Sequence, residues 1–321
     1  MIIAKTPLRI PLAGGLSDLA PYAERFGGET VSVTIDKHVY VTAKDDLDGR
    51  WDVRYRDSHE RTARARELRH DLLRESLELL GLRDRPVDVD FRVDLAGESG
   101  LGTSGALTVS VLHALHRLRG DTPDAWTLLH EAARVEVEML AGASGFHDPA
   151  ICALGGLRHL GYDGASVQDR ELRPAPGIRA AFDDALLLFY SGRHAKSKPS
   201  LDLLTSHLDE ALPVLHDIRA LAGELAGAFT AGDLAGVAHA VAEQQRLKQR
   251  LPGRFVDAEV EEVVARVAAT GAAAQLPGGK ISAFVLVVCP DGQRDAVREA
   301  LSDLREVPVR TTDEGTRAVA I

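Results

Sequence analysis

A glycine-rich segment at residues 96–107, AGESGLGTSGAL, constrains the fold more than any other stretch of the sequence. It contains G-x-G-x-x-G at residues 100–105, a pattern found in dinucleotide-binding turns. An alternating apolar run at 87–93 precedes it, and apolar residues with helical spacing follow it from Leu107 until Gly120. The segment therefore predicts a strand, a glycine turn and a helix whose first backbone N–H groups can bind an anion.

The residues after this helix argue against a dinucleotide-binding domain. Such a domain needs a second parallel strand that ends in Asp or Glu about 20 residues beyond the turn. Residues 121–140, DTPDAWTLLHEAARVEVEML, predict another helix instead. The P-loop pattern G-x-x-x-x-G-K-[ST] is absent as well, because PGGKIS at 277–282 lacks the upstream glycine. Two interpretations remain: a loop that binds phosphates, or a tight turn in which a Ser or Thr caps the helix.

Apolar periodicity predicts further strands and helices. Strands are expected at 30–43, 51–55, 87–93, 185–192, 281–289 and 316–321. Helices are expected within 59–82, ending at Gly81, and at 124–141, 199–230, 233–250 and 257–270. A loop, AGASGFHDP, precedes a short apolar segment at 150–160. Because the strand-rich part ends near residues 180–195, we expect two domains, 1–185 and 186–321.

Composition narrows the class of protein. A net charge of −10, with few aromatic residues, disfavours binding to nucleic acid. Cys152 and Cys289 lie in apolar runs, which predicts buried free thiols in a reducing compartment. No stretch approaches the roughly 18 apolar residues of a membrane span, and the N-terminus lacks the apolar core of a secretion signal. We therefore expect a cytoplasmic protein without a membrane segment.

Three segments, in their order along the chain, resemble the motifs of the GHMP kinase superfamily, which includes galacto-, homoserine, mevalonate and phosphomevalonate kinases. Residues 7–36, PLRIPLAGGLSDLAPYAERFGGETVSVTID, are similar to the first motif. Residues 98–107, ESGLGTSGAL, are similar to the second. Residues 142–162, GASGFHDPAICALGGLRHLGY, stand where the family has its catalytic Asp. The chain is most similar to the branch of D-glycero-D-manno-heptose 7-phosphate kinases, which opens with P-L-R-x-x-x-A-G-G-G-T-D-L, and the resemblance covers nearly the whole chain.

The resemblance implies a fold and an activity. The fold class would be α+β, with an N-terminal half like ribosomal-protein-S5 domain 2 and a C-terminal ferredoxin-like half with extra helices. The activity would be ATP-dependent phosphorylation of a hydroxyl on a sugar or sugar phosphate, with an anomeric hydroxyl as the favoured acceptor. ATP and Mg²⁺ would be required. A small sugar or polyol is the expected partner, with neither nucleic acid nor membrane, and a homodimer is compatible with the sequence.

The resemblance also implies roles for individual residues on the ATP side. The residues expected to wrap the phosphates are Gly97, Glu98, Ser99, Gly100, Leu101, Gly102, Thr103 and Ser104. The Ser104 hydroxyl and the Glu136 carboxylate would ligate Mg²⁺, a hard ion that prefers oxygen ligands.

On the acceptor side, Asp148 would be the catalytic carboxylate, and Arg9 would lie near the substrate or the transferred phosphate. The acceptor pocket would be lined by Gly14, Gly15, Ser17, Asp18 and His147. Structural interpretations exist for several of these residues. Asp148 precedes a proline, as turn residues often do, and Ser17-Asp18 could cap a helix.

The sequence also departs from the family pattern. Q-D-Q of the heptose kinases is His147-Asp148-Pro149 here, and the third glycine of their first motif is Leu16. The third family motif, G-A-G-G-G-G-F, has become LPGGKISAF at 276–284, in which Lys280 could supply a cation. Lys196 and Lys198 could meet a substrate phosphate but are better explained as a solvated loop. Two alternatives stay open: a cyclitol kinase, or a catalytically impaired protein that binds sugar or nucleotide as a regulator.

Overall fold

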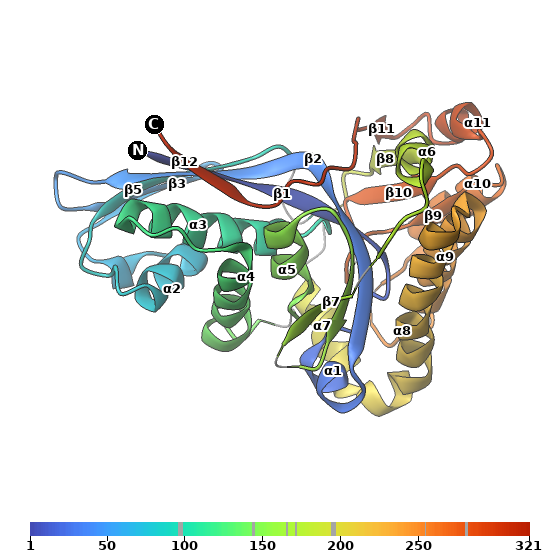
Figure 1. The fold of residues 1–321 in the computed structure, drawn as a ribbon, viewed down its shortest axis with the longest axis horizontal. Helices are drawn as coiled ribbons and strands as arrows, with labels where there is room; N and C mark the ends of the chain where they lie inside the picture. Colours follow the sequence, from blue (N-terminus) through green and yellow to red (C-terminus); the bar gives the residue numbers. More distant parts are fainter. Residues whose placement is uncertain are drawn as a thin grey trace.

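Figure 1 shows the computed structural model, which describes residues 1–95, 99–142, 145–164, 166–170, 172–193, 197–253, 255–279 and 282–321. Two β-sheets, one with eight strands and one with four, carry the helices. The first and last strands lie side by side, so the two termini meet (Figure 1), and the Met1 amino group donates to the Ile321 carbonyl oxygen at 3.2 Å. Within the described residues, no helix is both long enough and apolar enough to cross a membrane.

The larger sheet has the order β12-β1-β2-β5-β3-β4, with β6 paired to β2 and β7 to β6. Its strands are β1 (Ile2–Ala13), β2 (Gly28–Asp45), β3 (Trp51–Tyr55), β4 (Ser58–Thr62), β5 (Val87–Val93), β6 (Leu157–Tyr162), β7 (Val167–Arg170) and β12 (Arg317–Ala320). The pairing of β1 with β2 shifts register between Pro7 and Arg9. Such irregularities turn side chains out of the regular alternation and are common beside functional sites.

Helices cover one face of this sheet (Figure 1). They are α2 (Asp71–Leu79), α3 (Thr103–Arg119), α4 (Ala125–Ala133), a π-helix at Arg134–Met139, and α5 (His147–Leu154). The helix between β1 and β2, α1 (Ala20–Phe26), lies apart from these, at the bottom of the view in Figure 1. The central helix, α3, contacts β1 and β2 on one side and α2, α4 and α5 on the others. It is therefore buried on nearly every side, which its small and apolar residues allow.

The smaller sheet has the order β11-β8-β10-β9 and is antiparallel throughout. Its strands are β8 (Leu186–Tyr190), β9 (Ala273–Gln275), β10 (Phe284–Val288) and β11 (Arg305–Glu306). The helices of this half are α6 (Ile178–Ala185), α7 (Ser197–Ser206), α8 (Leu208–Ala231), α9 (Leu234–Lys248), α10 (Ala258–Ala268) and α11 (Arg294–Ala300). The smaller sheet begins at residue 186, near the predicted domain boundary. Because β12 returns to pair with β1 of the larger sheet, the two sheets do not correspond to two separate stretches of chain, and the division into domains 1–185 and 186–321 stays a prediction.

Several sequence predictions are confirmed. β3 and β5 have the predicted bounds, and α3 ends at Gly120, which adopts a left-handed conformation with φ of 103°. The predicted strands at 185–192 and 281–289 and helices at 233–250 and 257–270 correspond to β8, β10, α9 and α10. Both cysteines are buried and free.

Other predictions were wrong in extent. The helix expected within 59–82 is reduced to α2, because residues 58–62 form β4 against β3, and the Glu60 carboxylate accepts the N–H groups of Arg69 and His70 before the helix begins. The helix expected at 124–141 changes to a π-helix after Ala133. The helix expected at 199–230 is two helices, since the backbone of His207 leaves the helical conformation. Apolar spacing continues through each of these breaks, so periodicity alone did not reveal them.

We predict that Gly155 fixes the path of the C-terminal segment. Its φ is +74°, and a Cβ there would lie 2.3 Å from the backbone of Glu314 and Gly315. Gly155→Ala should lower the free energy of unfolding by about 3 kcal/mol, because an alanine at positive φ with ψ of 170° is strained and the backbone of Glu314 and Gly315 must also move. The control is Gly27→Ala, where φ is 72° and ψ is 145° but the nearest atom lies 3.5 Å from the added Cβ, and the loss should be only about 1–2 kcal/mol. Equal losses in chemical denaturation would contradict the collision.

Candidate functional site

The glycine segment forms a tight loop that ends at the start of α3. Gly100 and Gly102 have φ of 76° and 75°, a left-handed conformation that glycine adopts without a steric penalty. Gly102 occupies the N-cap position and no side chain caps the helix, so the interpretation as a Ser- or Thr-capped turn is wrong. The Ser99 hydroxyl instead lies 3.0 Å from the Thr103 hydroxyl and accepts the Leu101 N–H at 3.2 Å. The loop thus leaves the first N–H groups of α3 without a capping side chain among the described residues.

The loop before β10 packs directly onto this glycine turn. A Cβ at Gly100 would lie 2.3 Å from the Pro277 carbonyl oxygen, and one at Gly278 would lie 3.0 Å from the Gly100 Cα. The Ser282 hydroxyl donates to the Ser99 carbonyl oxygen. The third motif, although altered in sequence, therefore still closes over the second.

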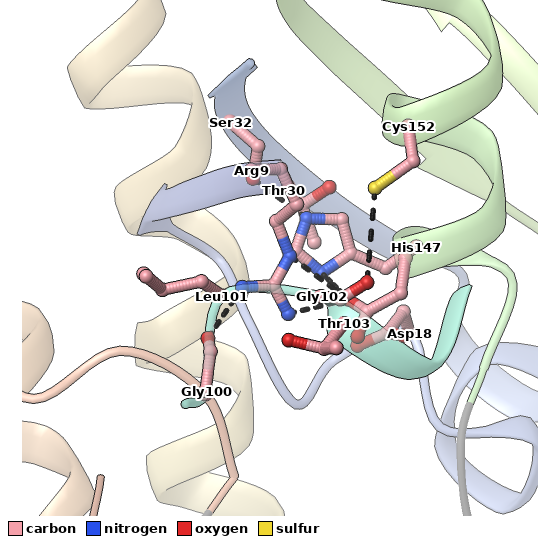
Figure 2. A network of polar contacts seen from close by, with 12 residues as sticks. Arg9, Asp18, Thr30, Ser32, Gly100, Leu101, Gly102, Thr103, His147 and Cys152 are labelled. Carbon is pink, nitrogen blue, oxygen red and sulfur yellow. Dashed lines mark hydrogen bonds and ion pairs between the residues drawn. The ribbon is translucent and has the colours of Figure 1, made fainter. Parts of the chain in front are cut away.

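Arg9 joins β1 to both the glycine loop and α5 (Figure 2). Its Nε donates to Asp148 Oδ1 at 2.9 Å, its Nη2 donates to the same oxygen, and its Nη1 donates to the Gly100 carbonyl oxygen at 2.6 Å. The Arg9 side chain is only 4% exposed, whereas that of Asp148 is 25% exposed. The buried guanidinium thus fixes the orientation of a carboxylate that remains accessible.

The sequence placed Asp148 in a loop, but the structure places it in the first turn of α5. The start of α3 lies against it, because a Cβ at Gly105 would approach the Asp148 Cβ and carbonyl carbon to 2.7 Å. The glycine at position 105 is required by this contact and not by its backbone conformation, since its φ is not positive. The phosphate-type loop and the candidate catalytic carboxylate are therefore packed together.

His147, beside Asp148, is buried and lies 2.6 Å from the Ser32 hydroxyl through its Nε2. Burial, reinforced by the charge of Arg9, lowers the pKa of His147 to about 3. His147 is therefore neutral at physiological pH and acts as a hydrogen-bonding group.

Asp18 follows the first-motif turn and is 8% exposed. It does not cap α1, whose N-cap residue is Leu19 without a side-chain hydrogen bond; instead Asp18 Oδ1 accepts the Leu16 N–H at 3.2 Å. Burial, together with the nearby negative charge of Asp148, raises the pKa of Asp18 to about 6. Above pH 6 the Asp18 carboxylate can therefore accept a hydrogen bond from a ligand, and below pH 6 the protonated carboxyl can donate one.

Two cavities meet at the Arg9–Asp148 pair. We call them the smaller cavity, of about 300 Å³, and the larger cavity, of about 770 Å³. The glycine loop and the surface between β3 and α2 line the larger cavity, whereas the first-motif turn, α5 and α9 line the smaller one. The residues common to both are Arg9, Ser104, Asp148, Lys198, Gly278 and Gly279.

Glu136 and Ser104 both border the smaller cavity. Glu136 lies on the π-helix, is 5% exposed, and accepts the Thr108 hydroxyl at Oε1 with a distance of 2.8 Å. Among the described residues, no group of three or more His, Cys, Asp or Glu side chains could hold a metal ion. A buried carboxylate and an accessible hydroxyl fit Mg²⁺ only if phosphate oxygens and water supply the other ligands.

The remaining sequence candidates divide into four groups: those that line the smaller cavity, those that line the larger cavity, those that support the site, and those outside the described residues. Gly15, Asp18 and His147 line the smaller cavity, and Ser99, Gly100, Gly102 and Thr103 line the larger one. Gly14, Ser17 and Leu101 line neither cavity and support the site through hydrogen bonds. The Gly14 N–H donates to Gln244, and the Ser17 hydroxyl donates to the Gly14 carbonyl oxygen. The Leu101 carbonyl oxygen accepts the backbone N–H of Arg9. Gly97, Glu98, His194, Lys196 and Lys280 lie outside the described residues.

Sequence reasoning missed Lys248, at the end of α9. Its side chain is buried, and Nζ donates to the carbonyl oxygens of Leu276 at 2.6 Å and Gly278 at 2.8 Å. Burial, together with the charge of Arg9, lowers the pKa of Lys248 to about 7. The helix carried no motif that marked this lysine, and only the tertiary contact between α9 and the third-motif loop reveals it.

Comparisons with known proteins agree with this geometry. A family model for the GHMP kinase N-terminal domain matches residues 66–156. A mevalonate kinase from Methanothermobacter thermautotrophicus is 39% identical over 75 residues, which make up 23% of this chain and 24% of that protein. The chain thus aligns with only about a quarter of that relative's length.

Solved structures resemble the chain over its full length. A D-glycero-D-manno-heptose 1-phosphate kinase from Bacteroides thetaiotaomicron matches with a TM-score of 0.82 and 21% identity, covering 100% of this chain and 99% of that one. A phosphomevalonate kinase from Streptococcus pneumoniae, in complex with phosphomevalonate and AMPPNP, matches with a TM-score of 0.79 and 14% identity, covering 97% and 100%. These matches confirm the predicted fold.

We predict that Asp18→Asn stabilises the protein at neutral pH. Because the folded protein raises the Asp18 pKa from 3.8 to about 6, the folded state binds more protons between these values, and stability falls as pH rises through them. Asparagine removes this loss, so the variant should gain up to about 3 kcal/mol of unfolding free energy at neutral pH and nothing below about pH 3. The control, Asp291→Asn at an exposed position, should leave the unfolding free energy unchanged at both pH values. A gain that is the same at acid and neutral pH would refute the burial explanation.

Proposed function

We propose that this chain is a member of the GHMP kinase superfamily and that it transfers the terminal phosphoryl group of ATP to a hydroxyl group of a small molecule. The observation that carries the proposal is the meeting of two cavities at one carboxylate. Arg9, Ser104 and Asp148 border both, so a donor in one cavity and an acceptor in the other would face each other across Asp148. Phosphoryl transfer requires chiefly such positioning and the neutralisation of charge.

The larger cavity suits the nucleotide. Its wall includes the uncapped start of α3, where backbone N–H groups and the helix dipole favour phosphate oxygens. Its volume of about 770 Å³ lies in the usual range for cofactor sites. The apolar and aromatic side chains at its other end, Val53, Tyr55 and Leu72, offer a surface for the base.

Ser104, which borders both cavities, and Glu136, which borders the smaller one, would hold Mg²⁺ where the cavities meet, beside the terminal phosphate. When bound, the ion would neutralise phosphate charge and help to align the terminal phosphoryl group. Thr108 lies on the same helix as Ser104 and donates to Glu136 Oε1, which fixes the orientation of the Glu136 carboxylate. Glu136 lies on the π-helix, and this hydrogen bond ties it to the helix that carries Ser104.

Asp148 would accept the proton of the attacking hydroxyl. Arg9 holds Oδ1 through two N–H groups, which leaves the carboxylate in one orientation at the boundary of both cavities. Because Arg9 also binds the Gly100 carbonyl oxygen, the same guanidinium keeps the base in register with the phosphate loop. Arg9 thus serves as a positioning residue and as a positive charge near the transferred group.

The acceptor we propose is a sugar or sugar phosphate, with an anomeric hydroxyl as the favoured position. The support is the sequence resemblance to heptose phosphate kinases and the fold of a heptose 1-phosphate kinase at 21% identity. In the smaller cavity, Asp18 and His147 offer hydrogen bonds to hydroxyl groups, and Lys248 offers a cation for an anionic group. A volume of about 300 Å³ restricts the acceptor to a small molecule.

The alternative is a regulator that binds nucleotide without catalysis. The altered third motif favours it, but the packing of Pro277 and Gly278 on Gly100 shows that this loop keeps its place over the glycine turn. Binding of Mg-ATP without transfer to any hydroxylated acceptor would support the regulator.

We predict that Asp148→Asn lowers kcat by a factor of about 10²–10⁴, because asparagine keeps the hydrogen bonds from Arg9 but cannot accept a proton. The measurement is ADP formation and phosphorylated product by mass spectrometry, with a panel of sugars, sugar phosphates and cyclitols. Affinity for Mg-ATP, measured by calorimetry, should change little.

The matched control is Asp169→Asn, which alters another Arg–Asp pair, with Arg158, on β7 away from both cavities. Its kcat should equal that of the wild type. If Asp148→Asn turned over acceptor at the wild-type rate, Asp148 would not be the base, and the catalytic assignment would fail.

A further inference from the structure

The sequence favoured a solvated loop for Lys198, but the structure places it in the first turn of α7, where it borders both cavities. Among the described residues that border both cavities, only Arg9 and Lys198 carry a positive charge. Phosphoryl transfer requires positive charge at this junction, because negative charge builds up on the terminal phosphate and on the oxygen that leaves with ADP. These two residues are therefore the candidates to supply it.

Arg9 is already engaged with protein groups. Its side chain is buried, two of its nitrogens donate to Asp148 Oδ1, and a third donates to the Gly100 carbonyl oxygen. The Asp148 carboxylate opposes the charge of Arg9, and Asp18 and Glu136 add further carboxyl groups to the lining of the smaller cavity. A phosphate that enters among these carboxyl groups gains most from a cation that can exchange its protein partner for the phosphate.

Lys198 meets that requirement. Its side chain is 65% exposed, and its Nζ lies 3.6 Å from Oδ1 of Asp202, one turn further along α7. An exposed ion pair at this spacing contributes little to stability, so replacing Asp202 by a more highly charged phosphate costs little. The flexible four-carbon side chain of lysine allows the ammonium group to turn without movement of the backbone.

The backbone that carries Lys198 is held in place beside the cavities. Leu201 lies three residues further along α7, on the same face as Lys198, and lines the smaller cavity. A Cβ at Gly279 would lie 2.9 Å from Leu201 Cδ2, so α7 packs closely against the third-motif loop at this point. Leu204, further along the helix, is fully buried. The helix α7 thus forms a fixed support from which Lys198 extends to the junction of the cavities.

We propose that Lys198 is a catalytic residue whose ammonium group leaves Asp202 and binds the terminal phosphate of the nucleotide where the two cavities meet. This inference rests on the proposed function and adds a residue to its site. In the transfer, the bond between the terminal phosphorus and the oxygen that links it to the second phosphate breaks, and a bond to the acceptor oxygen forms. The acceptor proton passes to Asp148, whereas Lys198 keeps its protons and stabilises the charge of the transferred group.

The test compares the binding of Mg-AMPPNP and Mg-ADP, which differ by the terminal phosphate, in calorimetry. Lys198→Gln should weaken AMPPNP binding by about tenfold, because a charge-assisted hydrogen bond is lost, and should leave ADP binding nearly unchanged. Lys198→Arg, which keeps the charge, should retain most of the AMPPNP affinity. With the panel of hydroxylated acceptors, Lys198→Gln should lower kcat by about 10²-fold.

Two controls separate this contact from other effects of the substitution. Asp202→Asn removes the same ion pair from α7 but keeps the lysine, so this variant should bind AMPPNP at least as tightly as the wild type. Lys44→Gln removes an exposed lysine that pairs with Asp88 and lines neither cavity, and it should change neither dissociation constant.

The proposal would be overturned if Lys198→Gln weakened AMPPNP and ADP binding equally or weakened neither, or if Asp202→Asn caused the same loss. Because binding is measured without an acceptor, the two claims fail separately. A protein with a Lys198-dependent preference for AMPPNP and no phosphoryl transfer would refute the proposed function and leave the contact with the terminal phosphate intact. An active kinase whose Lys198→Gln variant kept the wild-type kcat would refute the catalytic role of Lys198.

Discussion

The ion pair between the buried Arg9 guanidinium and the accessible Asp148 carboxylate is the interaction on which the rest of the site depends. Arg9 comes from β1, Asp148 from α5, and the Gly100 carbonyl oxygen that Arg9 also binds comes from the loop before α3. A buried guanidinium without its partner would be strongly destabilising, so these three segments are held in one arrangement. The contact is possible only because Gly102 and Gly105 lack side chains: a Cβ at the first would meet Arg9 and one at the second would meet Asp148. These glycines thus allow the close packing of the three segments.

The C-terminal half completes the site through backbone contacts. Lys248 binds the carbonyl oxygens of Leu276 and Gly278, and Gln244 binds the first-motif turn, so α9 holds both walls of the smaller cavity. The third-motif loop has fewer glycines than its family pattern, and the Lys248 ammonium group holds it by donating to two of its backbone carbonyl oxygens. Because burial lowers the pKa of Lys248 to about 7, an anionic ligand in the smaller cavity would raise that pKa by stabilising the charged form.

The sequence was informative where local chemistry decides the structure. The glycine turn, the helix that follows it and the strands with strict alternation were predictable, because conformation and periodicity are local properties. The place of Asp148 in a helix, the uncapped start of α3 and the role of Lys248 were not, because each depends on segments far apart in the chain. Leu16 shows the limit most clearly: its departure from glycine was visible in the sequence, but its left-handed φ and its place close to Gly279 follow only from the structure.

The central claim, that the two cavities hold donor and acceptor on either side of Asp148, is tested most directly by a crystal structure with Mg-AMPPNP. The account predicts that the phosphates contact the N–H groups at the start of α3 within the larger cavity, and that the terminal phosphate faces Asp148. Phosphates bound in the smaller cavity, or bound without contact to residues 99–104, would contradict it.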